Sequence, residues 1–420
     1  MNQHYEFFVG IDWATEAHEV CVVDTGGRIV AQRSIEHSGR GVAELIEWLS
    51  TLSHGGPERV AVGIEIPRGA VVESLVERGF HVYALNPKQL DRFRDRHSVA
   101  GAKDDRRDAY VLGDSLRTDL HCFRQVRIDD PLVIELRELS RIDEDLRGEA
   151  NRLSNRLREQ LQRYFPQALR LAPSADEPWF WDLLELAPTP AQAQRLAAKR
   201  VTRVLSKNRI RRWAAPEVLA HLQEPALRVA EGTTQAASTH IGLLLPRLRL
   251  VHSQRLDCVR RIEALLAQLG GEEPVEGERS EHRDVHVLRS FPGVGTVVCA
   301  TMLAEASQPL ADRDYHALRA HSGVAPITRQ SGKRMQVLMR HGCNSRLRNA
   351  LYHWARVSVQ HDESSRARYS ALRAKGHTHG RALRTVADRL LCVLVAALRA
   401  GELYDPQRHR VANLNVEATP

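Results

Sequence analysis

The sequence predicts an N-terminal α/β domain, then long amphipathic helices, then a mostly α-helical C-terminal domain. Apolar runs that end in acids alternate with helical patterns at the N-terminus, two later stretches repeat aliphatic residues at spacings of three, four and seven, and the remainder reads as helices broken by glycine turns. We expect boundaries at 1–125, 126–275 with a basic helical insertion at about 166–230, 276–405, and a tail at 406–420.

Composition restricts the class of protein. The 420 residues are 43% apolar and carry a formal net charge of +8, which favours a soluble protein with a polyanionic partner. The six cysteines are scattered singly, so neither a zinc site nor a disulfide framework is indicated. The start of the chain lacks a signal pattern, and the apolar run 390–398 is too short for a membrane span. We therefore expect a cytoplasmic, nucleoid-associated protein without a membrane partner.

The N-terminal elements follow from apolar runs and turn signals. The first three predicted strands are joined by short connections, one of them the Gly26-Gly27 turn, and so form an antiparallel meander. Helices with one apolar stripe separate the later strands. In order, we predict strands at 5–12, 19–24 and 28–36, a helix at 41–52, a strand at 59–65, a helix at 70–78, a strand at 81–85 and a helix at 106–116.

Four acids occupy special places in this order. Asp12 ends the first strand and Glu65 ends the fourth, while Asp105 and Asp108 lie one turn apart at the start of the last helix. Ligands bind at the carboxyl ends of strands in open α/β sheets. Carboxylates gathered there repel one another unless a hard cation neutralises them, and four could hold two Mg²⁺ ions for phosphoryl chemistry. This topology resembles the ribonuclease H-like fold in its resolvase version.

Two other acids compete with this set. Asp24 precedes a Gly-Gly pair, so a turn residue is its simpler interpretation. Asp104 stands four residues before Asp108, and helix geometry alone does not exclude it as the partner of that residue.

The middle of the chain predicts two long helices, at 131–164 and at about 235–269, both of coiled-coil character. Pro246 predicts a kink or break in the second. The two helices suit an antiparallel hairpin within one chain and a dimer seam equally well.

Between them, the stretch 189–216 holds eight Lys and Arg residues and no acid. Such a segment repels itself unless a polyanion screens it, so we expect nucleic acid here, with a solvated basic face as the alternative. Trp213 could stack on a base or pack internally. The candidate contacts are Lys199, Arg200, Arg203, Arg211 and Arg212.

The segment 270–284 reads as an acidic, glycine-containing linker. Beyond it, 287–298 predicts a short helix, a glycine turn and a second helix. Gly293 and Gly295 would let the backbone approach a phosphate beside the start of that helix. This arrangement resembles the helix-hairpin-helix motif, with an ordinary helical corner as the alternative.

A second acid-free stretch, 315–361, contains the predicted loop 323–333. Its Ser331 precedes a glycine and is flanked by cations, so it could attack a phosphodiester while arginines stabilise the charge. A phosphate contact or a turn former is the alternative from chemistry alone. The flanking candidates for nucleic-acid contact are Arg329, Lys333, Arg334 and Arg348.

The combination of motifs resembles the DEDD transposases of bacterial insertion sequences, the family that includes pilin-gene-inverting recombinases. Family members usually carry threonine or asparagine where Asp104 stands. The matching segments are Gly10-Ile11-Asp12, Glu65, Lys103-Asp104-Asp105-Arg106-Arg107-Asp108-Ala109, Pro292-Gly293-Val294-Gly295, Gly323-Val324-Ala325-Pro326, Ser331-Gly332, Gly342-Cys343-Asn344 and Leu347-Arg348.

The resemblance implies a mechanism. Mg²⁺ would be held by four acids, and Ser331 would form a transient phosphoserine link to DNA. Two subunits would share one composite site, in a dimer and in a tetramer during synapsis. A noncoding RNA from the element would select donor and target DNA. The four ligands implied are Asp12, Glu65, Asp105 and Asp108.

Three alternatives come from other classes. A metal-dependent junction nuclease would use the four acids with water and leave no covalent adduct. A non-enzymatic nucleic-acid-binding protein would keep the same residues in an inactive copy. An actin-like ATPase also starts with a G-x-D strand but needs a phosphate-binding glycine loop after it, and Trp13-Ala14-Thr15-Glu16 is not one.

Overall fold

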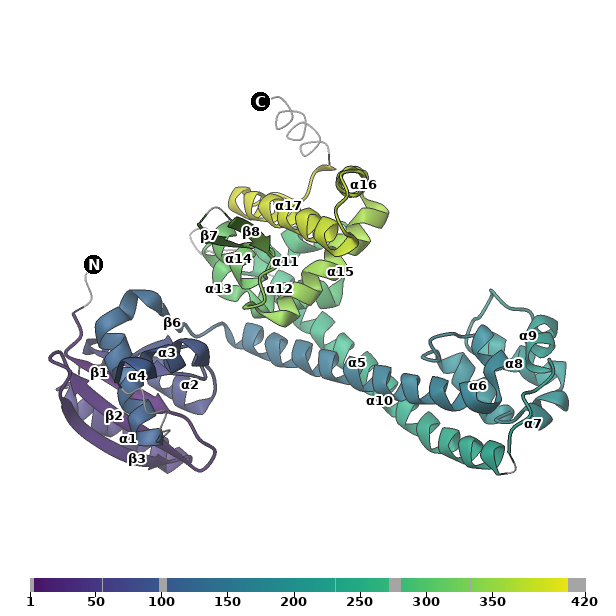
Figure 1. The fold of residues 1–420 in the computed structure, drawn as a ribbon, viewed down its shortest axis with the longest axis horizontal. Coiled ribbons are helices and arrows are strands. Elements are labelled where there is room, and N and C mark those ends of the chain that lie inside the picture. Colours follow the sequence, from purple (N-terminus) through teal and green to yellow (C-terminus); the bar gives the residue numbers. More distant parts are fainter. Residues whose placement is uncertain are drawn as a thin grey trace. The chain divides into compact units, whose positions relative to one another are not determined.

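The computed structural model describes residues 4–54, 56–97, 104–230, 232–271, 281–332 and 334–406. The chain separates into two compact units, Met1–Asp129 and Asp130–Pro420. Figure 1 shows their helices and strands, labelled where there is room.

Unit 1 contains one mixed six-stranded sheet in the order β3-β2-β1-β4-β5-β6. The expected antiparallel meander is present, and β4 and β5 add to it in parallel. The two-residue β6 pairs antiparallel with β5 and was too short to predict. The strands are β1 (Phe7–Asp12), β2 (Ala17–Asp24), β3 (Ile29–Glu36), β4 (Val60–Ile64), β5 (His81–Ala84) and β6 (Arg124–Gln125).

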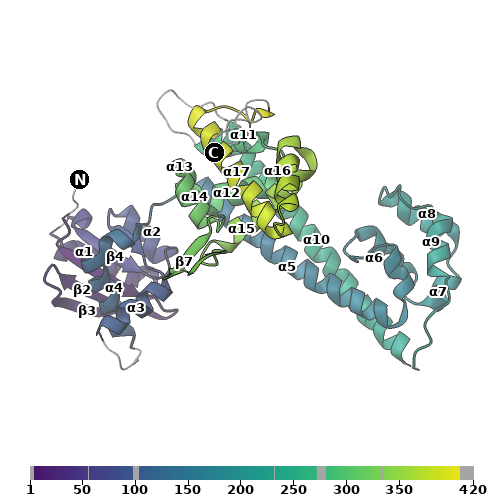
Figure 2. The same cartoon turned by 45° about the horizontal axis from the view of Figure 1, so that its top comes forward.

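The helices of unit 1 cover both faces of the sheet (Figure 2). Alternate side chains of the strands point to opposite faces, so Val9 and Ile11 pack in one apolar core while Phe8 packs in the other. The first core includes residues of α1 (Gly39–Leu52) and α2 (Ala70–Glu77), and the second includes residues of α3 (Pro87–His97) and α4 (Asp105–Asp119).

Helix α3 was not predicted. The sequence predicts no helix between the strand at 81–85 and the helix at 106–116, but Pro87 is the first residue of α3. Proline suits that position because its missing N–H has no intrahelical partner there and its φ angle is already helical.

Helix α4 lies unusually close to β1. A Cβ atom added at Gly10 would meet the carbonyl oxygen of Ala109 at 1.9 Å, and one added at Gly113 would meet the carbonyl oxygen of Phe8 at 3.1 Å. The later residue of the strand therefore contacts the earlier residue of the helix, so the two run antiparallel. The start of α4 consequently lies beside the carboxyl end of β1.

Unit 2 is built on two long helices, α5 (Pro131–Tyr164) and α10 (Thr233–Gly271), which lie side by side in Figures 1 and 2. Their ion pairs advance in opposite directions along the two helices, which makes the pair antiparallel. These pairs are Arg261–Glu135, Arg255–Asp143 and Arg247–Glu149. Of the two expected arrangements, the hairpin within one chain is the one present.

The break expected at Pro246 is absent, since α10 continues through it. Proline removes one hydrogen bond, to the carbonyl of Gly242, but both residues are solvent-exposed. Buried Leu244, Leu245 and Leu248 on either side keep the helix packed. Tertiary packing thus outweighs the local propensity.

A small helical lobe connects α5 to α10. It consists of α6 (Pro178–Leu186), α7 (Pro190–Gln194), α8 (Ala198–Lys207) and α9 (Ala215–Leu222). Trp179, Phe180 and Trp181 form its apolar centre together with residues from the adjoining ends of α5 and α10.

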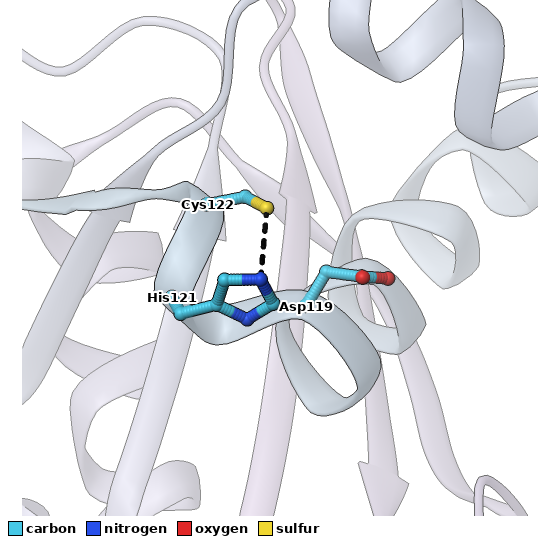
Figure 3. Close-up of side chains that lie close together, drawn as sticks. All are labelled: Asp119, His121 and Cys122. Atoms are coloured by element: carbon cyan, nitrogen blue, oxygen red, sulfur yellow. Dashed lines mark hydrogen bonds between the residues drawn. The ribbon is translucent and has the colours of Figure 1, made fainter.

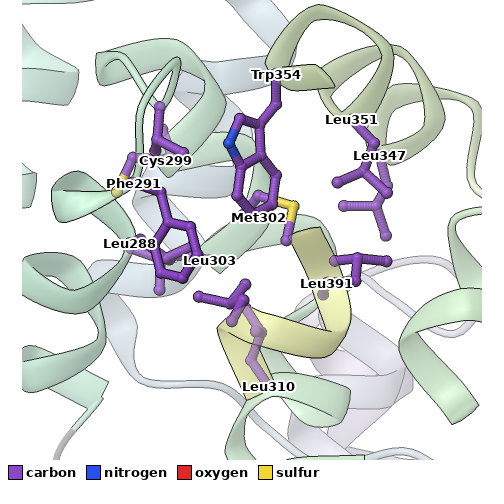
Figure 4. Close-up of a cluster of buried hydrophobic side chains, with 14 of the residues drawn as sticks. Leu288, Phe291, Cys299, Met302, Leu303, Leu310, Leu347, Leu351, Trp354 and Leu391 are labelled. Carbon is purple, nitrogen blue, oxygen red and sulfur yellow. The ribbon is translucent and has the colours of Figure 1, made fainter. Parts of the chain in front are cut away.

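The C-terminal part of unit 2 is mostly helical, and its core is drawn in Figure 4. Trp354, Phe291 and Met302 are among its buried side chains. Its helices are α11 (Glu281–Ser290), α12 (Thr296–Glu305), α13 (Ser307–Ala311), α14 (Tyr315–His321), α15 (Ser345–His361), α16 (Glu363–Ala374) and α17 (His379–Ala400).

Three expectations for this part need comment. The loop predicted at 323–333 is largely a hairpin, with β7 (Ile327–Ser331) paired to β8 (Arg334–Leu338). The linker expected at 270–284 overlaps helices at both ends, because α10 reaches Gly271 and α11 begins at Glu281. The tail at 407–420 lies outside the described residues. In the described part of the chain, no helix combines the length and apolar character of a membrane span.

Candidate functional site

Asp12 and Glu65 lie at the ends of neighbouring parallel strands. Ile11 of β1 is in register with Ile64 of β4, so the next residues along both strands are the two acids. Adjacent strands are about 4.8 Å apart, which places these half-buried residues beside one another at one edge of the sheet.

The other two acids come from the first turn of α4. Asp105 is exposed, whereas Asp108 is 1% exposed. Because α4 runs antiparallel to β1 at close distance, this turn lies beside the end of the strand that carries Asp12. Arg106 of the same turn contacts Glu19 at 3.6 Å, and Glu19 is the partner of Asp12 in the β1–β2 register.

The two competing acids are engaged elsewhere. Asp104 is the N-cap of α4, where its side chain accepts a hydrogen bond from the backbone N–H of Arg106. The carboxylate of Asp24 accepts hydrogen bonds from the backbone N–H groups of Gly26 and Arg28, both at 2.9 Å, which is the turn role expected for it.

Arg94 of α3 is a component that sequence reasoning missed. Its Nε and a terminal nitrogen donate to the two oxygens of Asp108 at 2.6 and 2.7 Å, and a further nitrogen donates to Asp91 at 2.6 Å. Burial lowers the pKa of Arg94, but its bonds to Asp108 and the charges of Asp108, Asp91 and Glu65 leave that pKa raised. Arg94 therefore links Asp108 to Glu65 electrostatically. The sequence offered no specific signal for this pairing, because Arg94 lies in a helix that was not predicted.

The carboxylate oxygens of this set suit Mg²⁺, which prefers hard oxygen ligands. In the structure, the buried Asp108 is neutralised by Arg94 instead. Among the described residues, the one group of three possible ligands within 4.8 Å of one another is Asp119, His121 and Cys122 (Figure 3). Asp119 of that group is already paired with Arg96 at 3.0 Å. The oxygens of the four acids have the chemistry that a hard cation prefers, and the elements that carry these acids meet at one edge of the sheet.

Ser331 is the last residue of β7 and is exposed, as are all the described residues of the β7–β8 hairpin. Residues opposite one another share a face, so Ser331, Arg334 and Arg329 lie on the same face of the hairpin. Gly332 forms the turn with a φ of +56°, and Lys333 lies outside the described residues. The serine is thus presented on a basic, open surface.

The base of this hairpin is fixed firmly. A Cβ at Gly323, whose φ is +73°, would meet the sulfur of Cys343 at 2.6 Å, so the two legs touch there. Arg340 donates to the carbonyl oxygen of Ala325 at 3.2 Å. Arg348 reaches the sulfur of Cys343 at 3.7 Å, which places this predicted contact residue beside the same base.

A buried ion pair anchors the segment that leaves the hairpin after β8 and leads to Asn344. Glu305, at the end of α12, accepts hydrogen bonds from Arg141 of α5 at 2.8 Å and from the side chain of Asn344 at 2.6 Å. Burial raises the pKa of Glu305, but Arg141 and Asn344 outweigh it, so the net pKa is lowered. Asn344 also caps α15. The Gly-Cys-Asn segment thus has a structural explanation that the sequence did not reveal.

The glycine turn before α12 divides into two roles. Gly293 has a φ of +86°, and a Cβ there would meet the backbone of α15 at 3.0 Å, so internal packing alone requires glycine. The side chains of Trp354 and Ser358 donate to the carbonyl oxygen of Pro292 at 3.1 and 2.6 Å. Gly295 has open space around it and stays the better candidate for a phosphate contact.

The cations of the lobe also divide into two groups. Arg212 donates to both oxygens of Glu177 at 2.6 Å and lies over the ring of Trp179, so it holds the lobe together. Lys207 similarly pairs with Asp182. The exposed lobe cations that no described acid contacts are Arg195, Lys199, Arg200, Arg203, Arg209 and Arg211. Trp213 is half-buried and packs edge-on against His221, which favours its packing role.

Comparison with known proteins identifies both ends of the chain. Residues 9–166 match a family model described as a transposase, and residues 285–370 match one described as the transposase IS116/IS110/IS902 family. The lobe lies outside both matched segments.

Three relatives illustrate the similarity. The putative transposase y4uE of Sinorhizobium fredii is 48% identical over 54% of this chain, which corresponds to 63% of that protein. The mini-circle putative transposase for IS117 of Streptomyces coelicolor is 32% identical over 96% of both chains. An uncharacterized 43.6 kDa protein of the insertion element IS110, from the same species, is 28% identical over 95% of both.

Proposed function

Because the chain belongs to the IS110/IS116/IS902 family of insertion-sequence transposases, we propose that it cuts and rejoins DNA strands through a transient phosphoserine link formed by Ser331. The observation that supports this most is the convergence of four acids at one edge of the sheet in unit 1, together with a serine on an open, basic hairpin face in unit 2.

The acids supply the metal-binding half of the proposal. The family implies a divalent metal, and we assign Mg²⁺, with two ions per site, to Asp12, Glu65, Asp105 and Asp108. When bound, the metal would polarise the scissile phosphate and lower the pKa of an attacking hydroxyl. The chain itself orients Asp108 through the two hydrogen bonds from Arg94. Arg94 also compensates the negative charge of this buried carboxylate.

Ser331 supplies the covalent half. Its Oγ would attack the phosphorus, so a P–Oγ bond forms while one P–O bond to deoxyribose breaks. The proton lost by the serine hydroxyl is balanced by the proton that the departing deoxyribose oxygen takes up to become a hydroxyl. Arg329 and Arg334 on the same face would stabilise the charge that develops on the phosphate. The freed deoxyribose hydroxyl of another strand reverses the step, which rejoins DNA without ATP.

The partners follow from charge. We assign DNA to the hairpin face and to Gly295, and a nucleic acid to the lobe cations Lys199, Arg200, Arg203 and Arg211. The sequence also predicts nucleic-acid contacts at Gly293, Lys333, Arg348 and Arg212. Of these, the structure gives Gly293, Arg348 and Arg212 contacts within the protein. An element-encoded guide RNA and assembly into dimers and tetramers complete the proposal.

The test is a cleavage and joining assay with purified protein, Mg²⁺, the ends of the element and its flanking noncoding transcript. We expect joined strands, and expect Ser331→Ala and Asp105→Ala each to reduce the rate at least ~10³-fold, because the first removes the nucleophile and the second a metal ligand. Asp24→Ala is the matched control, because that acid only forms a turn, and should keep near-normal activity. Cleavage that persists in Ser331→Ala with hydrolysed ends would instead identify a metal-dependent nuclease.

A further inference from the structure

The loop between β1 and β2, residues 13–16, carries an aromatic side chain directly beside the acid site. Trp13 follows Asp12 and is 36% exposed, in a loop whose other residues are also exposed. Large aromatic residues usually bury their surface in a core. Here the indole lies at the same edge of the sheet as the four acids, so its position needs an explanation.

Two histidines support the indole. The ring of Trp13 lies 6.1 Å from that of His18, tilted by 34°, and 6.1 Å from that of His37, nearly edge-on. The two imidazoles are themselves 5.0 Å apart and perpendicular. His18 is completely buried, so the support is part of the protein interior.

Hydrogen bonds fix these rings and the loop. The backbone N–H of Ala14 donates to Nδ1 of His18 at 3.3 Å, so that nitrogen carries no proton. Nε2 of His18 therefore donates to Nδ1 of His37 at 2.9 Å. The backbone N–H of His37 closes the circuit by donating to the carbonyl oxygen of Glu16 at 2.8 Å. Burial, and secondarily the charge of His37, lowers the pKa of His18, which agrees with a neutral ring.

The arrangement is that of a rigid platform with an accessible aromatic ring. Aromatic side chains bind nucleic-acid strands by stacking on bases, irrespective of sequence, and each such stack strengthens binding about five- to a hundred-fold. A strand whose scissile phosphate lies at the acid site, next to the cation that Asp12 would help to hold, would bring a neighbouring base within reach of the next residue in the chain, Trp13.

We propose that Trp13 is a stacking platform for a nucleobase next to the scissile phosphate. The inference rests on the proposed function, since that function places DNA at Asp12. Trp13 is a binding residue in this account and takes no part in the chemistry. Its support by His18 and His37 keeps the ring in place before DNA arrives, so little entropy is lost on binding.

The competing explanation is that Trp13 merely covers His18. A substitution that removes the aromatic face of Trp13 but keeps an apolar side chain distinguishes the two explanations. Trp13→Leu still covers His18 but cannot stack, and Trp13→Phe retains a smaller aromatic face. Thermal unfolding of the full-length variants monitors folding.

The experiment measures binding of the full chain to a duplex that carries the element end, with the flanking transcript present. A single abasic site is moved through the positions on either side of the cleavage junction. For the unmodified chain, we expect one position where the abasic site weakens binding five-fold or more. In Trp13→Leu that penalty should disappear, and in Trp13→Phe most of it should remain.

The proposal is overturned if no abasic penalty depends on Trp13, or if Trp13→Leu only lowers the unfolding temperature. The readout is binding, so it does not depend on strand joining or on Ser331. A chain that binds DNA with a Trp13-dependent penalty but forms no serine link would contradict the proposed function and retain the platform. A chain that forms the serine link but shows no Trp13-dependent penalty would support the proposed function and contradict the platform.

Discussion

The two halves of the proposed chemistry are presented in opposite ways. The acids of unit 1 sit at the ends of buried strands and on a helix pressed against the sheet, and Asp108 is 1% exposed. Ser331 lies on a hairpin whose described residues are all exposed. Two-stranded hairpins alone are marginally stable, so this one depends on its base.

The contrast follows from the chemistry required. Carboxylates that converge on a cation must be held by a stiff scaffold, because their mutual repulsion would otherwise separate them. A nucleophile that must reach a phosphate in a large polymer has to be accessible. In the hairpin, stiffness is therefore confined to the buried contacts below Ser331, namely Glu305 with Arg141 and Gly323 with Cys343.

The largest effect on stability is expected where the base of the hairpin is broken. Glu305→Ala leaves the largely buried Arg141 with only the exposed Glu138 as an acid partner and removes an acceptor from Asn344. Loss of one member of a buried pair costs about 3–5 kcal/mol. Chemical denaturation of the full chain measures this change. Glu138→Ala is the control, because that exposed acid also contacts Arg141 and should cost less than about 1 kcal/mol.

The next effect tests the stiffness of the acid site. Gly10→Ala forces a methyl group against the carbonyl of Ala109 and should destabilise unit 1 by about 3 kcal/mol or more, since neither backbone can move freely. Gly39→Ala has open space in helix α1 and should be neutral or slightly stabilising. Equal unfolding midpoints for the two variants would show that α4 is not pressed against β1.

A third test extends the comparison to the lobe, where paired charge is buried. Burial raises the pKa of Asp182, but bonds from Lys207, Asn208 and Arg249 outweigh it and lower that pKa from 3.8 to about 2. A carboxylate whose pKa is lowered in the folded state stabilises the fold at pH values above its ordinary pKa of 3.8. This stabilisation is lost as the pH falls towards 2. Asp182→Asn should therefore cost about 2 kcal/mol at pH 7, and the difference from the unmodified chain should shrink between pH 4 and 2. A difference that is constant with pH would refute the ionic explanation.

The smallest effects are expected on the exposed hairpin itself. Gly332→Ala places a side chain at a φ of +56° with nothing nearby, which should cost about 1 kcal/mol. Met335→Ser, at a side chain 65% exposed, should change stability by less than about 0.5 kcal/mol. If Met335→Ser lowers the stability of the protein as much as Glu305→Ala does, the hairpin arms are packed, and the contrast between the open hairpin and its buried base is wrong.

Much of the acid site could be predicted from the sequence because strand ends and helix starts leave local signals. The positions of Asp12 and Glu65 followed from buried runs ending in acids, and the two strands are indeed neighbours in register. Arg94 could not be predicted, because its bond to Asp108 spans two helices whose contact depends on the tertiary fold.

The hairpin left a weaker signal. Both strands of the hairpin are exposed, so neither face has to be apolar and the sequence shows no clear alternation. A stretch of this kind is easily interpreted as a loop. The helix pair was easier, since its apolar stripes are long. Of the kink or break predicted at Pro246, the break is absent because the packing around it outweighs the local breaker. Chemistry alone left Ser331 with several interpretations, the family resemblance favoured the nucleophile among them, and that role stays a prediction.

The central claim is that Ser331 becomes covalently linked to DNA with the help of the acids. The most direct measurement is to trap the protein–DNA adduct with Mg²⁺, the element ends and the flanking transcript, digest it, and map the nucleotide-bearing residue by mass spectrometry. The account predicts a nucleotide linked through phosphate to Ser331, absent from Ser331→Ala and from Asp105→Ala. Cleaved DNA with no adduct, or an adduct on another residue, would contradict it.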